Sequence, residues 1–113
     1  MYKILVIEPD KASRLTLQNL LSFMGYDEVA AANCQEALEI AATEHVDMIL
    51  VNSLVPSAEC QNMRELLFAA GVEPRVVAYA DAIGTNNIAQ HVDDYLESPY
   101  IASALNQKIR LAV

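Results

Sequence analysis

This chain of 113 residues has no tryptophan, only three glycines and two cysteines, and few basic side chains. It contains seven Lys and Arg residues and fifteen Asp and Glu residues, which gives a net charge of −8. Binding of DNA or RNA requires Lys and Arg to neutralise phosphates, so we expect no nucleic acid partner for this domain. The same acidity excludes attraction to an anionic membrane surface.

Long apolar runs are also missing, since none approaches the about 18–20 residues that a membrane span needs. The chain does not open with a charged and then apolar leader, so we expect a cytoplasmic protein. Cys34 and Cys60 have no metal-ligand spacing and are expected to be free thiols. His45 and His91 are isolated, so neither predicts a metal site or catalysis.

The scarcity of glycine excludes one more class of protein. Gly25, Gly71 and Gly84 form no glycine-rich loop after the first apolar run. The usual phosphate cradle of dinucleotide- and flavin-binding folds is therefore absent. Apolar residues nevertheless make up 54% of the chain, enough for one buried core. We expect a single domain over residues 1–113, either complete or the N-terminal module of a longer protein.

The apolar residues alternate between strand-like runs and helical periodicity. Strands are expected at 3–8, 28–32, 47–52, 75–80 and 93–97. Helices are expected at 12–24, after Asn33, from 56 to 70, and from about 100 to the end. The 81–91 stretch predicts a turn and at most a short helix. This alternation indicates right-handed βαβ units and a parallel sheet covered on both faces.

Details of the helices can also be predicted. Asp10, Asn33 and Ser57 are expected to cap helix starts, and Gly25 to end the first helix. The inward side of the first helix is expected to carry Leu15, Leu17, Leu20, Leu21 and Met24. That of the third is expected to carry Cys60, Met63, Leu66, Leu67 and Ala70.

Several motifs resemble the receiver domain of two-component response regulators. The second βα unit reads Gly25-Tyr26, then Ala31-Ala32-Asn33 and Glu36-Ala37-Leu38. Asp94-Tyr95-Leu96 with Pro99 resembles the fifth strand and the proline that follows it. The likeness covers nearly the whole chain. It implies a flavodoxin-like, CheY-like αβα sandwich whose five parallel strands have the order 2-1-3-4-5.

The resemblance also implies where an active site would lie. Active receivers hold an acidic pair after strand one, a phosphate-accepting aspartate after strand three, a hydroxyl after strand four and a lysine after strand five. The carboxylates bind magnesium, and the aspartate attacks a phosphohistidine donor. The matching positions here are Glu8 and Pro9, with Asp10 just beyond, then Asn52, Ala80 and Ser98.

These substitutions predict a receiver shape without receiver chemistry. The amide of Asn52 is a poor nucleophile at phosphorus and carries no charge for a cation. Magnesium prefers hard oxygens in octahedral order, usually with carboxylates, and only Glu8 is placed firmly in the pocket. Ala80 and Ser98 remove a phosphate donor and the main positive charge. We therefore predict no catalytic residue, no metal and no cofactor.

Two further expectations follow from the resemblance. Tyr95 stands where the family carries its switch aromatic. It is expected either to pack inward toward Ala80, fixing one state, or to be an ordinary half-buried strand tyrosine. The segment between Ala80 and Ser98 is shorter than in the family, which predicts a shortened fourth helix and puts the family's output face in doubt.

The leading hypothesis is a non-enzymatic pseudo-receiver that binds a protein partner in bacterial signal transduction independently of phosphorylation. One alternative is a receiver that uses substitute groups such as Glu8, Asp10 or Ser53 for phosphotransfer or magnesium binding. Another is a structural module that forms a weak homodimer. The sequence names neither the partner nor the process.

Overall fold

The computed structural model describes residues 2–79, 92–96, 107 and 110. Its strands are β1 (Lys3–Ile7), β2 (Asp27–Ala31), β3 (Met48–Asn52), β4 (Arg75–Tyr79) and β5 (Asp94–Leu96). Its helices are α1 (Lys11–Phe23), α2 (Cys34–Thr43) and α3 (Ser57–Ala69). Each predicted strand within this part of the chain is present, with ends shifted by a residue or two.

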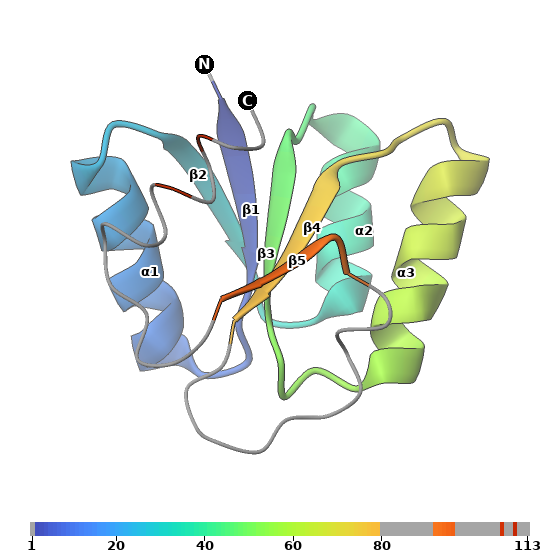
Figure 1. Cartoon of the computed structure of the whole chain (residues 1–113), viewed down its shortest axis with the longest axis horizontal. Coiled ribbons are helices and arrows are strands. Elements are labelled where there is room, and N and C mark those ends of the chain that lie inside the picture. The colour runs from blue at the N-terminus through green and yellow to red at the C-terminus, as the bar shows by residue number, and fades with distance from the viewer. Residues whose placement is uncertain (1, 80–91, 97–106, 108–109, 111–113) are drawn as a thin grey trace.

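The strands form one parallel sheet in the order β2-β1-β3-β4-β5 (Figure 1). The four longer strands carry the order 2-1-3-4, and β5 adds three residues beside β4. All four longer strands end at the same edge of the sheet, at the bottom of Figure 1. The predicted flavodoxin-like fold with a parallel sheet and covering helices is thus confirmed.

The helices lie on both faces of the sheet, which explains why the central strands are apolar throughout. In β1 and β3, residues that point to one face pack with Leu17 and Leu21 of α1. Alternate residues of the same strands pack with Ala37 of α2 and with Met63 of α3. Since successive side chains in a strand point to opposite faces, β1 and β3 supply both cores at once.

The first two helices begin as predicted, at polar side chains. The Asp10 carboxylate accepts a 2.9 Å hydrogen bond from the Ser13 N–H at the start of α1. The Asn33 side chain accepts one of 2.9 Å from the Glu36 N–H at the start of α2. Gly25 follows α1 with a φ of 91°, a left-handed conformation that favours glycine.

The cap prediction for the third helix was wrong. Pro56 occupies the cap position of α3 and makes no side-chain cap hydrogen bond, while Ser57 is the first helical residue. Proline at this end lacks only an N–H that the first helical turn would leave unbonded. A hydroxyl cap is therefore not what starts this helix.

Two leucines predicted to face inward are half exposed, Leu15 at 51% and Leu66 at 50%. Successive residues turn by about 100° around a helix, so Leu15 lies almost opposite the buried Leu17. Leu66 falls at the edge of the buried stripe that contains Met63 and Leu67. Both corrections reflect a narrower inward face than the sequence suggested.

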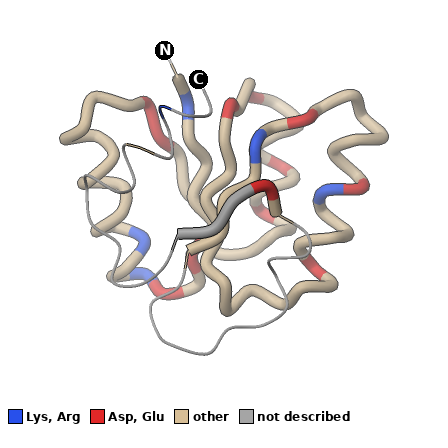
Figure 2. The backbone as a smooth tube through the Cα atoms, viewed as in Figure 1, with Lys and Arg blue, Asp and Glu red and all other residues tan. Residues whose placement is uncertain are grey.

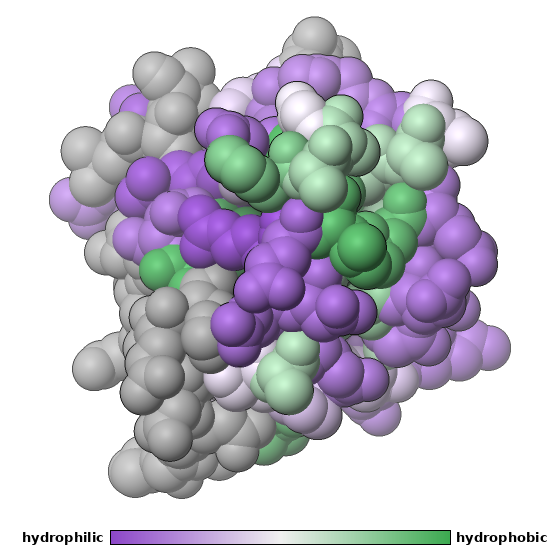
Figure 3. Space-filling model, turned by 90° about the vertical axis from the view of Figure 1, so that its right-hand side faces the viewer, coloured by the Kyte–Doolittle hydropathy of each residue, from purple (hydrophilic) through white to green (hydrophobic). Residues whose placement is uncertain are grey.

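Within the described part of the chain, Asp and Glu positions are spread along the backbone and are not gathered in one segment (Figure 2). Apolar side chains gather over the C-terminal half of α3 in Figure 3, where Leu66 and Phe68 are exposed. None of the helices in the described part of the chain combines the length and hydropathy that crossing a bilayer requires. The predicted fourth helix lies outside the described residues. Of the predicted last helix only Gln107 and Arg110 are described, and both are helical and exposed.

Candidate functional site

Three polar side chains meet where neighbouring strands end. Glu8 directly follows β1, Asn52 is the last residue of β3 and Tyr79 is the last of β4. Asn52 and Tyr79 are register partners, and β1 and β3 are paired up to the preceding residues, Ile7 and Val51. The three side chains therefore form a row on the sheet face covered by α1. We call Glu8, Asn52 and Tyr79 the Glu8 cluster.

The cluster is buried, with 2% of Glu8 and 1% each of Asn52 and Tyr79 exposed. Glu8 Oε1 accepts a 2.7 Å hydrogen bond from Asn52 Nδ2 and a 2.6 Å bond from the Tyr79 hydroxyl. Glu8 Oε2 accepts a 2.9 Å bond from the Asp10 N–H. A buried carboxylate is costly unless it is well hydrogen-bonded, and these donors meet that need.

The two ends of the Asn52 amide have different partners. Its nitrogen donates to Glu8, and its Oδ1 accepts a 2.8 Å hydrogen bond from the Leu54 N–H. The orientation is therefore fixed by chemistry, since a flipped amide would place oxygen against carboxylate and NH₂ against N–H. The carboxamide thus ties β3 both to the end of β1 and to the loop that follows it.

The loop after β3 is also tied to the end of β4. The Ser53 N–H donates a 2.7 Å hydrogen bond to the Tyr79 carbonyl, and the Val55 N–H donates one of 3.0 Å to the Asn52 carbonyl. Ser53 itself is buried, at 2% exposure. The loop conformation is therefore set by bonds within the protein.

Asp10 does not bring its carboxylate to Glu8. That carboxylate accepts hydrogen bonds from both the N–H and the hydroxyl of Ser13, each 2.9 Å long. Both bonds lower the pKa of the Asp10 carboxyl, and the bond from the Ser13 N–H has the larger effect. Pro9 is exposed and offers no side-chain ligand. At the predicted pair positions only Glu8 is a carboxylate, and Asp10 just beyond them serves as a helix cap.

A basic side chain lies beside the end of β1. Arg14 Nη1 donates a 2.9 Å hydrogen bond to the Glu8 carbonyl and a longer one, 3.4 Å, to the Pro9 carbonyl. Arg14 comes from the first turn of α1, so the helix cap at Asp10 also positions this cation. Its contact is with the main chain of Glu8.

For three residues of the predicted pocket, the structure describes no side chain. Ala80 and Ser98 lie outside the described residues. Tyr95 is described only as part of β5, where it pairs with Ala78 of β4, and its side chain lies outside the description. The two alternatives for Tyr95, inward or ordinary half-buried, therefore stay predictions.

The magnesium ion that the receiver resemblance implies does not fit this donor set. Both Glu8 oxygens already accept protein donors, and the Asn52 oxygen accepts the Leu54 N–H. The Asp10 carboxylate faces the start of α1. Across the described ranges, no group of three or more His, Cys, Asp or Glu side chains gathers as a metal site would. Magnesium favours several oxygen ligands at about 2.0–2.1 Å, which these side chains do not offer.

Tyr79 was missed by the sequence reasoning. Tyr79 precedes Ala80 and ends an apolar strand, Arg75-Val76-Val77-Ala78-Tyr79, so the sequence pattern assigned it to the core and not to the site. One signal was available, because a buried tyrosine needs a partner for its hydroxyl. The strand alternation places that hydroxyl on the same face as Asn52.

Other groups that the sequence singled out lie away from the Glu8 cluster. Cys34 and Cys60 form no disulfide with each other, as predicted, and both thiols are buried. His45 is exposed and contacts Asp47 at 2.8 Å, which agrees with a surface role. His91 lies outside the described residues. A surface pocket of about 490 Å³ lies at the opposite end of β4, where its lining includes Arg75.

Two sequence relatives illustrate the similarity to known proteins. The chain is 30% identical over 119 residues to a probable transcriptional regulator, ycf27, of Cyanophora paradoxa, covering 96% of this chain and 46% of the relative. It is 29% identical over 112 residues to the response regulator MprA of Mycolicibacterium vanbaalenii, covering 96% and 48%. The chain thus spans about half the length of these curated relatives. No protein-family model matches the chain.

The fold also has close counterparts among solved structures. The CheY-like response regulator receiver domain from Methylobacillus flagellatus superposes with a TM-score of 0.82 at 20% identity, covering 100% of this chain and 99% of that one. At this identity the structural match establishes the fold. Taken together, the relatives and the structural match support a response-regulator receiver domain of the CheY-like type.

Proposed function

We propose that this chain is a pseudo-receiver, a protein-binding module of two-component signal transduction that acts without phosphorylation of residue 52. The observation that carries the proposal is the state of Asn52. Its side chain is buried, lacks a nucleophilic carboxylate, and directs its nitrogen toward Glu8 at 2.7 Å. A phosphoryl donor would meet a neutral amide, which is a poor nucleophile at phosphorus, beside the negative charge of the Glu8 carboxylate.

A module without phosphotransfer acts through its surface. The relatives are regulators about twice as long as this chain. The proposal therefore includes an output function carried by another segment of the whole protein. The net charge of −8 favours a partner with basic contact residues over nucleic acid. Figure 2 supports a general electrostatic attraction more than one localised acidic patch.

The positions of the substitute groups weigh against phosphotransfer. Asp10 is engaged as the cap of α1, and the Ser53 side chain is buried. Glu8 accepts three donors, and a metal or phosphoryl group bound at its Oε1 would have to displace one of the two donors there. No observation on the described residues favours the alternative of a homodimer, which sedimentation at several concentrations would detect.

The proposal can be tested with acetyl phosphate, a small phosphoryl donor. The protein is incubated with it and millimolar MgCl₂, and intact mass and peptide mapping are recorded over time. A receiver with aspartate at the position of Asn52 serves as the positive control. We expect the control to gain a phosphoryl group and this chain to gain none. A stable phosphoryl group on this chain, on any side chain, would overturn the proposal.

A further inference from the structure

We propose that Tyr79 and Asn52 act together as an internal substitute for a divalent cation at Glu8. This inference deepens the proposed function and rests on it in one respect, that the site works without a bound cation. The relationship depends on a tyrosine at the end of β4 as well as on the amide at the end of β3.

The first step concerns the acceptor capacity of Glu8. An ionised carboxylate has about four lone-pair sites. Three of them take donors from Asn52, Tyr79 and the Asp10 N–H, at 2.7, 2.6 and 2.9 Å. A cation bound to Oε1, which already accepts both Asn52 and Tyr79, would have to displace one of these donors. The displaced group would then remain buried without its partner, which is costly.

The second step concerns how firmly Tyr79 is held. Its side chain is 1% exposed and belongs to the core between the sheet and α1, together with Leu17 and Val77. Its carbonyl also accepts the Ser53 N–H at 2.7 Å. The phenol is therefore preorganised by packing and by the main chain. Moving its hydroxyl away from Glu8 would require repacking of that core.

The third step is the consequence for residue 52. If the Asn52 amide were the only group that prevents cation binding, Asn52→Asp alone would create a metal site. The tyrosine hydroxyl would still satisfy Glu8 Oε1 in that variant. Tyr79 is thus a positioning residue that opposes cation binding independently of residue 52.

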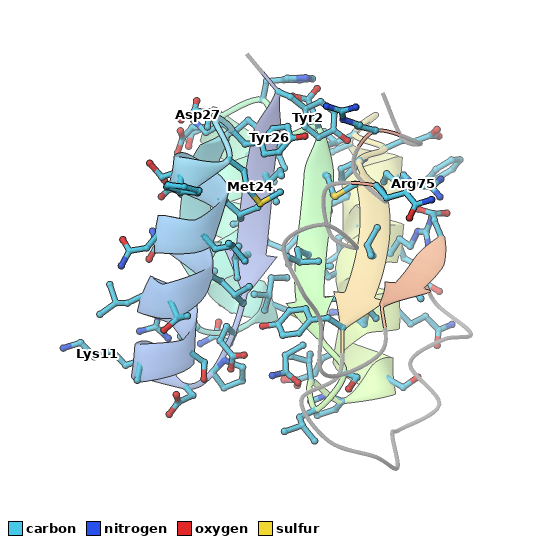
Figure 4. All side chains as sticks on the ribbon, turned by 60° about the vertical axis from the view of Figure 1, so that its left-hand side comes forward. Tyr2, Lys11, Met24, Tyr26, Asp27 and Arg75 are labelled. Carbon is cyan, nitrogen blue, oxygen red and sulfur yellow. The ribbon has the colours of Figure 1, made fainter. Side chains whose placement is uncertain are left out.

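The test compares Asn52→Asp with the double variant Asn52→Asp/Tyr79→Phe. Phenylalanine keeps the ring and removes only the hydroxyl. The matched control is Asn52→Asp/Tyr2→Phe, because Tyr2 lies with Tyr26 at the opposite end of the sheet from Lys11 and the start of α1 (Figure 4). Binding of MnCl₂ is measured by the loss of the free-ion signal in electron paramagnetic resonance.

We expect the double variant Asn52→Asp/Tyr79→Phe to bind Mn²⁺ about tenfold more tightly than Asn52→Asp, since the Tyr79 hydroxyl no longer competes with the cation for Glu8 Oε1. The Tyr2 control should bind like Asn52→Asp. Equal affinities of Asn52→Asp and its Tyr79→Phe derivative would overturn the inference. Phosphorylation of the unmodified chain by acetyl phosphate would instead overturn the proposed function, so the two failures are distinguishable.

A second measurement covers the case in which the double variant does not fold. In the unmodified protein, proton NMR should show a slowly exchanging Tyr79 hydroxyl proton and slowly exchanging protons of the Asn52 side-chain amide. In the single variant Tyr79→Phe, the hydroxyl signal should vanish and the Asn52 amide signals should shift. Rapid exchange of both groups in the unmodified protein would contradict the inference.

Discussion

Asn52 and Glu8 are joined by a 2.7 Å hydrogen bond from Nδ2 to Oε1, although 44 residues separate them in the sequence. The bond crosses from the end of β3 to the end of β1 in a part of the core where both side chains are buried. A carboxylate at position 52 could make this bond only if one of the two acids carried a proton. Residue 52 therefore affects stability as well as chemistry.

Replacing Asn52 with aspartate should lower the free energy of unfolding at pH 7, without added metal, by about 2 kcal/mol. The substitution removes a donor from Glu8 and places two buried carboxyl groups together. Urea denaturation followed by circular dichroism measures the change. Asn62→Asp, an exposed position on α3, controls for the added negative charge and should change stability by less than about 0.5 kcal/mol. Stability of Asn52→Asp at or above that of the unmodified protein would contradict this account of the site.

The cap of α2 gives a second prediction. The Asn33 side chain accepts the Glu36 N–H, and the Glu36 carboxylate in turn accepts the Ala32 N–H at 2.7 Å. Asn33→Ala should therefore cost about 1 kcal/mol in thermal or urea unfolding. Ser57→Ala should cost less than about 0.5 kcal/mol, because Ser57 is not the cap of α3. Equal costs at the two positions would show that the cap assignments are wrong.

Asp47 provides a pH-dependent prediction. Its Oδ2 accepts the Lys3 N–H at 2.8 Å, and this bond holds the pKa of the Asp47 carboxyl below its ordinary value, against the opposing effect of burial. A hydrogen bond to His45 acts in the same direction. Since the pKa is lower in the folded state, the stabilisation is present above the unfolded value of about 3.9 and is lost as pH falls through the folded value.

Asp47→Asn should consequently destabilise the protein at pH 7 by about 1 kcal/mol or less, given the partial exposure of the side chain. The difference between variant and unmodified protein should shrink below about pH 4. Urea unfolding at a series of pH values measures it, with the more exposed Asp27→Asn as the comparison. A difference that stays constant down to pH 2 would argue against a charge-dependent role for Asp47.

The two thiols should be unreactive in the folded protein. Burial, chiefly, raises the pKa of Cys34 to about 12, and burial also raises the pKa of Cys60. At pH 8 the folded protein should react with a disulfide reagent such as DTNB about a thousandfold more slowly than the unfolded chain, because the thiolate is the reacting form. The absorbance of the released thiolate gives the reaction rate, and peptide mapping identifies which cysteine has reacted. Rapid modification of either cysteine in the native state would show that this region opens readily.

The fold was predictable from local signals. The runs that became β1 and β3 are apolar and β-branched, and they are buried on both faces. Asp10, Asn33 and Gly25 act within a few residues of themselves, so their effects on helix ends can be read directly from sequence. Asn52 and Glu8 could be placed at neighbouring strand ends because a parallel sheet brings such ends to one edge.

What could not be predicted depends on contacts between distant segments. The link between Tyr79 and Glu8 spans 71 residues. A buried tyrosine needs a partner for its hydroxyl, but the local sequence does not identify Glu8 as that partner. The sequence predicted that Asp10 caps α1, but only the geometry shows that its carboxylate faces Ser13 and not Glu8. The exposure of Leu15 depends on how α1 is rotated against the sheet, which an apolar periodicity does not fix within one side chain.

The hydroxyl of Tyr79 and the amide of Asn52 converge on one oxygen atom of Glu8. Substitutions at the two positions are therefore energetically coupled, and their effects will not add. Among natural variants of this chain, an aspartate at position 52 should co-occur with a residue at position 79 that carries no hydroxyl. Co-variation of this pair across genomes would be evidence that both hydrogen bonds to Glu8 act together.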